Sequence, residues 1–146
     1  MNLGAYAGKT GSLPETVDLP WEYFAVRGCF LDTRGPLVIH MNSYWGLLVR
    51  VITRSHDTHA GPGFLGQTID YGVVVEAKAW IGSNSLLAGC RIGEGAVVAA
   101  GSVVRGQVVA PGVMVAGNPA RVIARWSGNS WNYLPVETSG FETRLS

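Results

Sequence analysis

Apolar residues return every six positions in the stretch from residue 80 to residue 120. Ile92, Val98 and Val104 are the clearest case, and mostly Gly, Ala and Ser lie between them. A helix repeats its apolar face every three to four residues, and a flat strand repeats every two. A period of six instead fits a short strand followed by a tight corner. The pattern predicts a β-solenoid, in which each turn buries its apolar residues against the turns above and below.

The same spacing occurs once more, earlier in the chain. Ile39, Trp45 and Val51 are six apart, so the first turns of the coil are expected to begin near residue 37. The period is not perfect, because two later intervals are eleven residues long instead of twelve: 81 to 92 and 104 to 115. We therefore expect an irregular corner near residue 106 or residue 111.

Composition agrees with such a coil and narrows the functional classes. Gly occurs 20 times in 146 residues, which suits tight corners, and charged residues make up only 14%, against a usual share of about 25%. The low charge predicts that other subunits cover part of the surface. A net charge of +1 without a basic cluster argues against nucleic-acid binding, and the chain has no run of apolar residues long enough for a membrane-spanning helix.

The two cysteines and the N-terminal segment indicate a cytosolic protein. Cys29 and Cys90 match no zinc-binding spacing and are too few for a disulfide scaffold, so Cys90 is interpreted as a small buried filler. The first twenty residues contain no continuous apolar segment of the kind found in signal peptides.

The chain is predicted to form one domain in three parts. Residues 1–35 are expected to be an irregular N-terminal cap, and the aromatic-rich stretch 21–35 to hold one or two strands. Residues 36–120 are expected to form the coil, interrupted by a Gly-rich loop over 56–72. Residues 121–146 are interpreted as a C-terminal cap and tail. Long loops of this kind are usually functional or disordered.

Four sequence blocks resemble a known family. They are WIG at 80–82, IGEGAVVAAGSVV at 92–104, AGNPARVI at 116–123 and SHD at 55–57. Over roughly residues 36–126 the chain resembles the hexapeptide-repeat acyltransferases, which are left-handed parallel β-helix enzymes. The SHD block is similar to the active-site loop of their sugar O-acetyltransferase branch, which includes the maltose, galactoside and colanic-acid acetyltransferases.

The resemblance implies a homotrimer with each active site between two neighbouring coils. It implies acetyl-CoA as the acetyl donor, a sugar hydroxyl as the acceptor and no metal. His56 takes the place of the family's histidine. The loop reads HDTH, and not the HP-type sequence of the maltose and galactoside enzymes, which favours the colanic-acid-like or polysaccharide branch. The residues implied to bind the cofactor are Trp80, Ser83, Ala100, Gly117, Asn118, Pro119, Ala120 and Arg121.

The loop carries the candidate catalytic groups. A neutral imidazole is well suited to accept the proton of an alcohol as the alcohol attacks a thioester, so His56 is the expected general base. Asp57 is expected either to orient that imidazole or to cap the loop. His59 is a candidate for acceptor binding and an alternative base, and His40 is interpreted as a structural or interface residue.

The cofactor residues have separate expected roles. Trp80 precedes an inward-facing isoleucine, so its ring should point outward and line the cofactor groove. The backbone N–H groups of Ser83 and Ala100 are expected to face the acetyl thioester, where donors of this kind stabilise developing negative charge. The Arg121 guanidinium suits a CoA phosphate.

Three other functions remain open from the sequence. An N-acyltransferase acting on an amino sugar would share the base and the cofactor. A solenoid used for assembly would need neither. A zinc enzyme of the γ-type carbonic anhydrase class would need three histidines, and the chain has His40, His56 and His59.

Overall fold

Three sheets form the walls of a coil in the computed structural model, which describes residues 16–61 and 67–135. Sheet A contains, in order, β1 (Thr16–Val17), β3 (Leu37–Ile39), β8 (Val73–Val75), β11 (Cys90–Ile92) and β14 (Val108–Val109). Sheet B contains β2 (Phe30–Leu31), β5 (Arg50–Ile52), β10 (Leu86–Ala88) and β13 (Val103–Arg105). Sheet C contains β4 (Tyr44–Trp45), β9 (Trp80–Ile81), β12 (Val97–Val98), β15 (Val113–Gly117), β16 (Ala120–Trp126) and β17 (Trp131–Tyr133).

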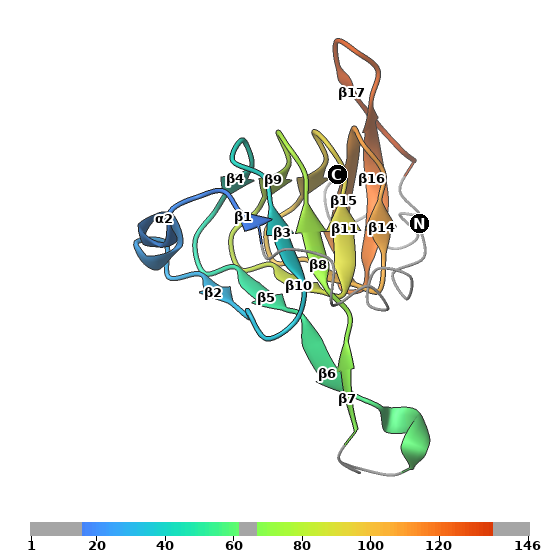
Figure 1. Ribbon diagram of the computed structural model, residues 1–146. Coiled ribbons are helices and arrows are strands. Elements are labelled where there is room, and N and C mark those ends of the chain that lie inside the picture. The colour runs from blue at the N-terminus through green and yellow to red at the C-terminus, as the bar shows by residue number, and fades with distance from the viewer. Residues whose placement is uncertain (1–15, 62–66, 136–146) are drawn as a thin grey trace.

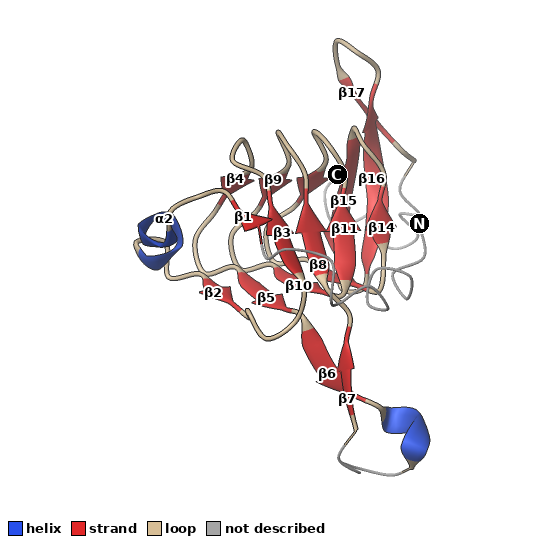
Figure 2. Ribbon diagram, viewed as in Figure 1, coloured by secondary structure: helices blue, strands red, loops and turns tan. Residues whose placement is uncertain are grey.

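The chain visits sheets B, A and C in turn and then begins again (Figure 1). Strands of successive turns are parallel and in register, so that Val51 is the partner of Leu87 and Leu87 is the partner of Val104. We name the three edges by the sheets they join: the BA, AC and CB corners. The predicted all-β architecture is confirmed, and Figure 2 shows how little helix the described residues contain.

The residues with six-residue spacing form the core. Side chains at all six predicted positions are buried: Ile39, Trp45, Val51, Ile92, Val98 and Val104. Cys90 is also fully buried, and burial raises the pKa of its thiol to about 12, as expected of an inert filler.

Residues 21–35 hold one strand, as predicted, but the first part of the stretch is a helix that the sequence did not predict. Residues 21–25 form the short helix α2 (Trp21–Ala25), and only Phe30–Leu31 is strand. Phe24 lies on the buried face of the helix, and its ring packs edge-on against Trp45 at 5.2 Å. The end of a coil exposes apolar side chains that need a cover, and one helical turn places Tyr23 and Phe24 over it better than an extended strand.

The two short intervals have one location, the BA corner. Leu87 and Ile92 are five residues apart, as are Val104 and Val109, and each pair spans this corner. Gly89 and Gly106 turn the chain there with φ of 51° and 61°, values that favour glycine. The irregular corner therefore lies at residue 106 and not at residue 111.

Two hairpins leave the coil (Figure 1). At the BA corner, β6 (Arg54–His56) pairs antiparallel with β7 (Thr68–Asp70), and the 3₁₀ helix η1 (Thr58–Ala60) follows β6. At the end of the coil farthest from α2, β16 turns back antiparallel on β15 and continues into β17. The described ranges contain no helix that is both long and apolar enough to cross a membrane.

Candidate functional site

The β6–β7 hairpin carries His56 away from the wall of the coil. The side chain is exposed, and its Nδ1 lies 3.3 Å from the carbonyl oxygen of Gln67, across the hairpin. The backbone N–H of Asp57 donates to the same carbonyl oxygen at 3.0 Å. Gln67 therefore holds both the histidine ring and the strand that carries it.

The neighbouring candidates lie on η1. The carboxylate of Asp57 accepts from the backbone N–H of His59 at 2.8 Å and so caps this 3₁₀ helix. His59 itself is exposed. Of the two roles considered for Asp57, the structure shows the capping contact, and the contact on the imidazole of His56 comes from a backbone carbonyl.

A buried carboxylate holds the base of the hairpin. Asp32 is 2% exposed and accepts from the backbone N–H of Thr53 at 3.1 Å and from Nε of Arg34 at 2.8 Å. The hydrogen bond from the Arg34 guanidinium holds the pKa of the Asp32 carboxyl well below its usual range. The carbonyl oxygen of Thr53 accepts from the N–H of Tyr71 at 2.8 Å, so the chain leaves and rejoins the coil at one fixed residue.

A second contact closes the hairpin just outside this point. Arg54 on β6 pairs with Asp70 on β7, with Nε–Oδ1 and Nη2–Oδ2 distances of 2.5 and 3.2 Å. The same guanidinium donates to the carbonyl oxygen of Arg34 at 3.0 Å. A bidentate pair of this kind fixes geometry as well as charge, so it orients the strand that carries His56.

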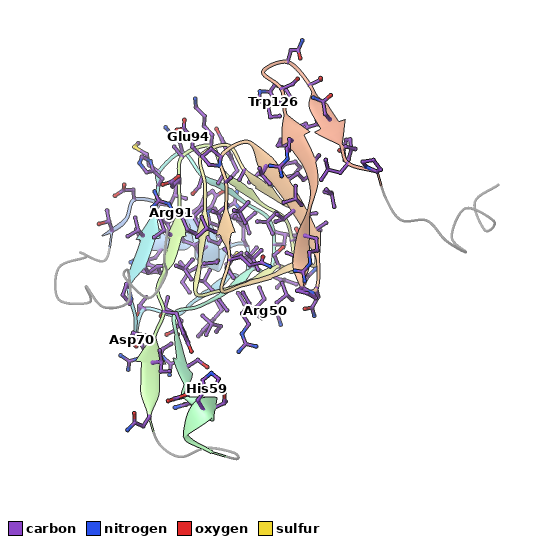
Figure 3. The ribbon with its side chains drawn as sticks, turned by 90° about the vertical axis from the view of Figure 1, so that its right-hand side faces the viewer. Arg50, His59, Asp70, Arg91, Glu94 and Trp126 are labelled. Atoms are coloured by element: carbon purple, nitrogen blue, oxygen red, sulfur yellow. The ribbon has the colours of Figure 1, made fainter. Side chains whose placement is uncertain are left out.

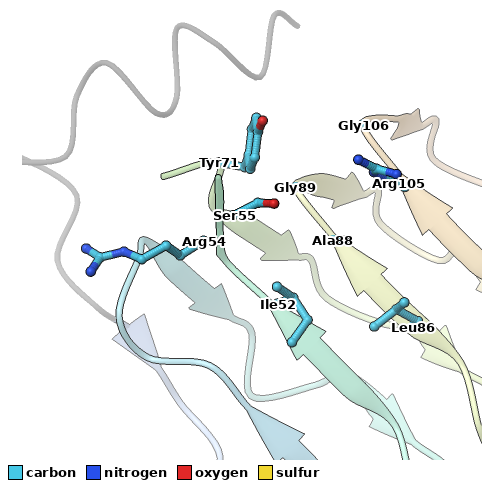
Figure 4. Close-up of a pocket in the computed structure, with 9 residues that line it drawn as sticks. All are labelled: Ile52, Arg54, Ser55, Tyr71, Leu86, Ala88, Gly89, Arg105 and Gly106. Atoms are coloured by element: carbon cyan, nitrogen blue, oxygen red, sulfur yellow. The ribbon is translucent and has the colours of Figure 1, made fainter. Parts of the chain in front are cut away.

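A hollow of about 440 Å³ lies between the hairpin and the BA corner (Figure 4). Tyr71 and Ser55 border it on the hairpin side, and Arg105 borders it on the coil side, whereas Arg54 points away. Ligand pockets usually have volumes of about 300–1,000 Å³, so the space suits a small molecule. The glycine corners at 89 and 106 keep its floor low because they add no side chains.

The predicted cofactor residues gather at the CB corner instead. Ile81 pairs with Val98 and Val98 with Val115, so Ser83, Ala100 and Gly117 occupy the same position in consecutive turns. The turns approach so closely that a Cβ at Gly82 would lie 2.5 Å from the backbone nitrogen of Ala100. This column of backbone is therefore rigidly stacked.

The flanking cofactor candidates are accessible to a ligand. Trp80 lies on the outer face of sheet C and is 56% exposed, as predicted for an outward ring. Asn118 and Pro119 form the exposed turn between β15 and β16, and Ala120 is buried behind it. Arg121 is exposed, and its Nη1 donates to the carbonyl oxygen of Ala120 at 3.0 Å.

One chain does not bring the two groups of candidates together. The hairpin leaves sheet B after Ile52, at the carboxyl end of β5, whereas Ser83 and Ala100 precede the amino ends of β10 and β13. Strands β5, β10 and β13 are parallel, so His56 lies beyond the carboxyl ends of the strands of sheet B and the CB corner lies at their amino ends.

The three histidines do not converge either. His40 follows β3 at the AC corner and is exposed, at the far end of sheet A from the hairpin. Among residues 16–61 and 67–135, no group of three or more His, Cys, Asp and Glu side chains could hold a metal ion.

The sequence prediction missed the polar residues that root the hairpin, Asp32, Thr53, Arg54 and Asp70. One signal was available: Arg54 and Asp70 carry opposite charges at the two ends of a Gly-rich excursion from the repeat. The contact of Gln67 with His56 had no comparable signal, because a backbone carbonyl leaves no mark on residue type.

Residues 72–106 match the family model described as "Bacterial transferase hexapeptide (six repeats)". These residues span the coil from β8 to β13. The match confirms the resemblance to hexapeptide-repeat transferases. The chain has no match among curated proteins.

Several solved structures share the fold. A galactoside acetyltransferase in complex with coenzyme A is 21% identical, with a TM-score of 0.58 over 73% of this chain and 57% of that one. The polySia-specific acetyltransferase NeuO is 22% identical, with a TM-score of 0.55 over 82% of this chain and 59% of that one. A variant of AntD, an N-acyltransferase from Bacillus cereus, in complex with dTDP and coenzyme A, is 17% identical, with a TM-score of 0.58 over 80% and 63%. The chain thus spans less than two thirds of each of these three proteins.

Proposed function

Because the chain carries the hexapeptide repeat of bacterial transferases, we propose that it is an acetyl-CoA-dependent O-acetyltransferase. The acceptor is the hydroxyl of a sugar or of a polysaccharide precursor. The coil is left-handed, as in the family that it resembles, and the working enzyme is a cytosolic homotrimer. Two of the similar structures, the galactoside and polySia acetyltransferases, are named for sugar acceptors, which supports this choice of substrate class.

The observation that carries the proposal is the hairpin that presents His56. This short strand pair leaves the coil between β5 and β8, and its base is fixed by Asp32 and Thr53. A buried carboxylate is costly unless it is hydrogen-bonded, and the hydrogen bond that Asp32 accepts fixes Thr53 at the root of the hairpin. A general base does need a defined position, because proton transfer requires hydrogen-bonding distance.

The contact with Gln67 also supports a particular tautomer. A carbonyl oxygen only accepts hydrogen bonds, so its approach to within 3.3 Å of Nδ1 favours a proton on that nitrogen. The lone pair then lies on Nε2, which is the nitrogen that would accept the proton of the acceptor hydroxyl. Gln67 thereby takes the orienting role that a carboxylate has in a triad.

The separation of the candidates favours a site between two copies. His56 lies beyond the carboxyl ends of the strands of sheet B, and the column of Ser83, Ala100 and Gly117 lies beyond their amino ends. A neighbouring coil that offers its CB corner to the hairpin would complete the site. Exposed apolar side chains on sheets B and C, among them Phe30, Tyr44 and Trp80, support contact between copies on these faces.

The residues at the CB corner fit a thioester and its nucleotide. Trp80 offers a flat apolar surface to the pantetheine arm, and the stacked backbone at Ser83 and Ala100 offers N–H donors to the thioester oxygen. Arg121, at the far end of this column, suits a phosphate.

The reaction needs no covalent enzyme intermediate. The acceptor oxygen attacks the carbonyl carbon of the thioester, the new C–O bond forms and the C–S bond breaks. The hydroxyl proton passes to Nε2 of His56 and from there to the departing thiolate. A positioned base of this kind typically contributes about 10²–10⁴-fold in rate.

The test is release of free thiol from acetyl-CoA in the presence of a panel of sugars and nucleotide sugars. We expect His56→Gln to lower turnover by about 10²–10⁴-fold and to leave the melting temperature unchanged, because the side chain is exposed. Thr58→Ala, at an exposed position on the same hairpin, is the matched control, and His59→Gln tests the alternative base. Activity of His56→Gln within a few-fold of the wild type would show that His56 is not the base.

Mixed oligomers test whether the site is shared. Chains carrying His56→Gln and chains carrying Trp80→Ala would be co-expressed after each variant alone is shown to be inactive. If one copy supplies the hairpin and the next supplies the CB corner, about one site in three in each mixed trimer, and about a quarter of all sites in a random one-to-one population, contain both intact residues. Complete inactivity of the mixture would place both residues in one chain's site.

An N-acyltransferase is the second candidate, and one observation favours it. The B. cereus N-acyltransferase AntD has the same fold, with a TM-score of 0.58. An amino sugar would meet the same base and the same donor. Thiol release with amino sugars but not with their hydroxyl counterparts would select this alternative.

A further inference from the structure

Two tryptophans form an exposed aromatic surface at the end of the coil farthest from α2. Trp126 ends β16 and Trp131 begins β17, and their ring centroids are 5.6 Å apart with 60° between the planes. Trp126 is 47% exposed. Exposed indoles are costly to leave in water, so a pair held in a fixed geometry points to a ligand.

A hollow of about 540 Å³ lies beside the two rings and is bordered by Lys78, Glu94 and Pro111. The Lys78 Nζ and a carboxylate oxygen of Glu94 are 3.9 Å apart, and both side chains are largely exposed. The hollow therefore has an aromatic wall and, facing it, a hydrogen-bond donor next to an acceptor.

The backbone conformation of Lys78 also points to a ligand in this hollow. Lys78 has φ of 60°, a left-handed conformation that costs most residues about 1–2 kcal/mol. Gly95 and Gly112 occupy the same corner in the next two turns, with φ of 67° and 65°. The chain thus keeps a lysine side chain at a position where the next two turns have glycine.

We propose that this hollow, lined by Lys78, Glu94, Trp126 and Trp131, is a binding site for a saccharide unit. The two faces of a pyranose ring are largely C–H groups, which pack on an indole, and its rim carries hydroxyls that both donate and accept hydrogen bonds. An aromatic wall opposite a paired ammonium and carboxylate matches both properties. A neutral ring also suits a rim whose two charges cancel.

A second copy of the chain fits this surface less well. Protein interfaces bury about 800 Å² per partner, whereas the patch is two rings at the tip of a narrow hairpin with charges of both signs beside it. Tyr133 on the same hairpin is also exposed, but the larger group of exposed apolar side chains lies elsewhere, on Phe30, Tyr44, Leu47, Leu48 and Trp80.

The saccharide site is separate from the proposed site of acetyl transfer. Trp126 lies at the AC corner, where its backbone N–H donates to the carbonyl oxygen of Gly112. Arg121 lies near the other end of β16. Figure 3 shows Trp126 and Glu94 at one end of the molecule and His59 and Asp70, on the other hairpin, at the opposite end. A ligand that reaches both sites is longer than one sugar unit.

The consequence that the acceptor of acetyl transfer is a polymer rests on the proposed function. Binding itself is independent of catalysis. If acetyl transfer fails and glycan binding holds, the chain has a saccharide site and no transferase activity. If transfer holds and binding fails, the enzyme acts on a small acceptor.

The experiment is a glycan microarray probed with the purified full chain and with the double variant Trp126→Ala/Trp131→Ala. Trp21→Ala is the matched control, because Trp21 is equally exposed, at 53%, on the helix at the other end of the coil. We expect the wild type and Trp21→Ala to bind at least one class of oligosaccharide and the double variant to lose more than tenfold in binding. Far-UV circular dichroism and size-exclusion chromatography verify that the variants keep their fold and oligomeric state.

Lys78→Gly provides a second variant that does not depend on the tryptophans. It removes the ammonium and installs the residue that the next two turns use at this corner, so the fold is expected to hold. We expect several-fold weaker glycan binding and an unchanged KM for acetyl-CoA. Binding that is absent in the wild type, or equal in all variants, would overturn the proposal. Dissociation of the oligomer in the double variant would assign the patch to contact between copies and overturn it as well.

Discussion

The coil and the β6–β7 hairpin are held in place by different forces. In the coil, fully buried residues such as Leu87 and Val104 stack directly on one another from turn to turn. In the hairpin, the anchoring contacts are polar: Asp32 with Thr53, and Arg54 with Asp70. One element is stabilised by burial of apolar surface and the other by charge and hydrogen bonds at its root.

This difference separates stability from positioning. The stacked turns tolerate so little change that a Cβ at Gly82 would meet two backbone atoms within 2.7 Å. The hairpin projects from this frame, and its contacts fix where His56 lies without contributing to the core. Variants in the coil should therefore change the free energy of unfolding, and variants in the hairpin should change local order and, under the proposed function, activity.

The largest effect on stability is expected from Leu87→Ala. Leu87 is completely buried between Val51 and Val104, and removing a buried leucine side chain typically costs about 2–5 kcal/mol. Urea unfolding monitored by circular dichroism measures the loss. Leu86→Ala is the matched control, because Leu86 is on the same strand, points outward and is only partly buried. Equal losses for the two variants would contradict an interior made of alternate residues.

A smaller and pH-dependent effect is expected from Asp32→Asn. The variant loses the ionic hydrogen bond to Arg34, whose exposure to solvent limits the cost to about 1–2 kcal/mol. The folded-state pKa of Asp32 is depressed, so its contribution is fully present above the unfolded pKa of about 4 and falls as pH drops below that value. Thermal unfolding at pH 7 and pH 3 should show a gap between wild type and variant that narrows at pH 3. A gap of constant size would mean that the charge of Asp32 has no part in anchoring Thr53.

The coil was predictable from the sequence because its repeat is visible in the residue types. Each turn needs apolar residues at fixed intervals, and the chain supplies them at Ile92, Val98 and Val104. Even the two shortened turns were visible as eleven-residue intervals. The register that places Ser83, Ala100 and Gly117 in one column follows from the same count.

The hairpin and the end helix were less predictable for physical reasons. The helix α2 has only five residues and gains its stability from covering Trp45, a tertiary contact that local propensity does not reveal. The root of the hairpin joins Asp32 to Thr53 across 21 positions of sequence. Hydrogen bonds over such distances have no periodic signature, so a single sequence shows the excursion but not what orients it.

The smallest effect on global stability is expected from Arg54→Gln. This variant tests most directly whether polar contacts position the hairpin while apolar burial stabilises the coil. The pair with Asp70 is about one-third exposed, and pairs of this kind contribute at most about 1 kcal/mol, so the midpoint of urea unfolding should barely move. Hydrogen exchange should nevertheless become faster at the hairpin amides, such as that of Asp57, because the guanidinium also ties β6 to the Arg34 carbonyl. Arg50→Gln, on the adjacent strand β5, is the matched control.

Under the proposed function, Arg54→Gln should lower turnover several-fold while the KM for acetyl-CoA stays unchanged, since the imidazole of His56 loses its fixed position and the CB corner does not. Asp70→Asn should have the same effect, and the double variant should be no worse than either single one, because both remove one contact. Additive losses would show that the two residues act separately. Unchanged exchange at the Asp57 amide would show that the Arg54–Asp70 pair is not needed to hold the hairpin in place.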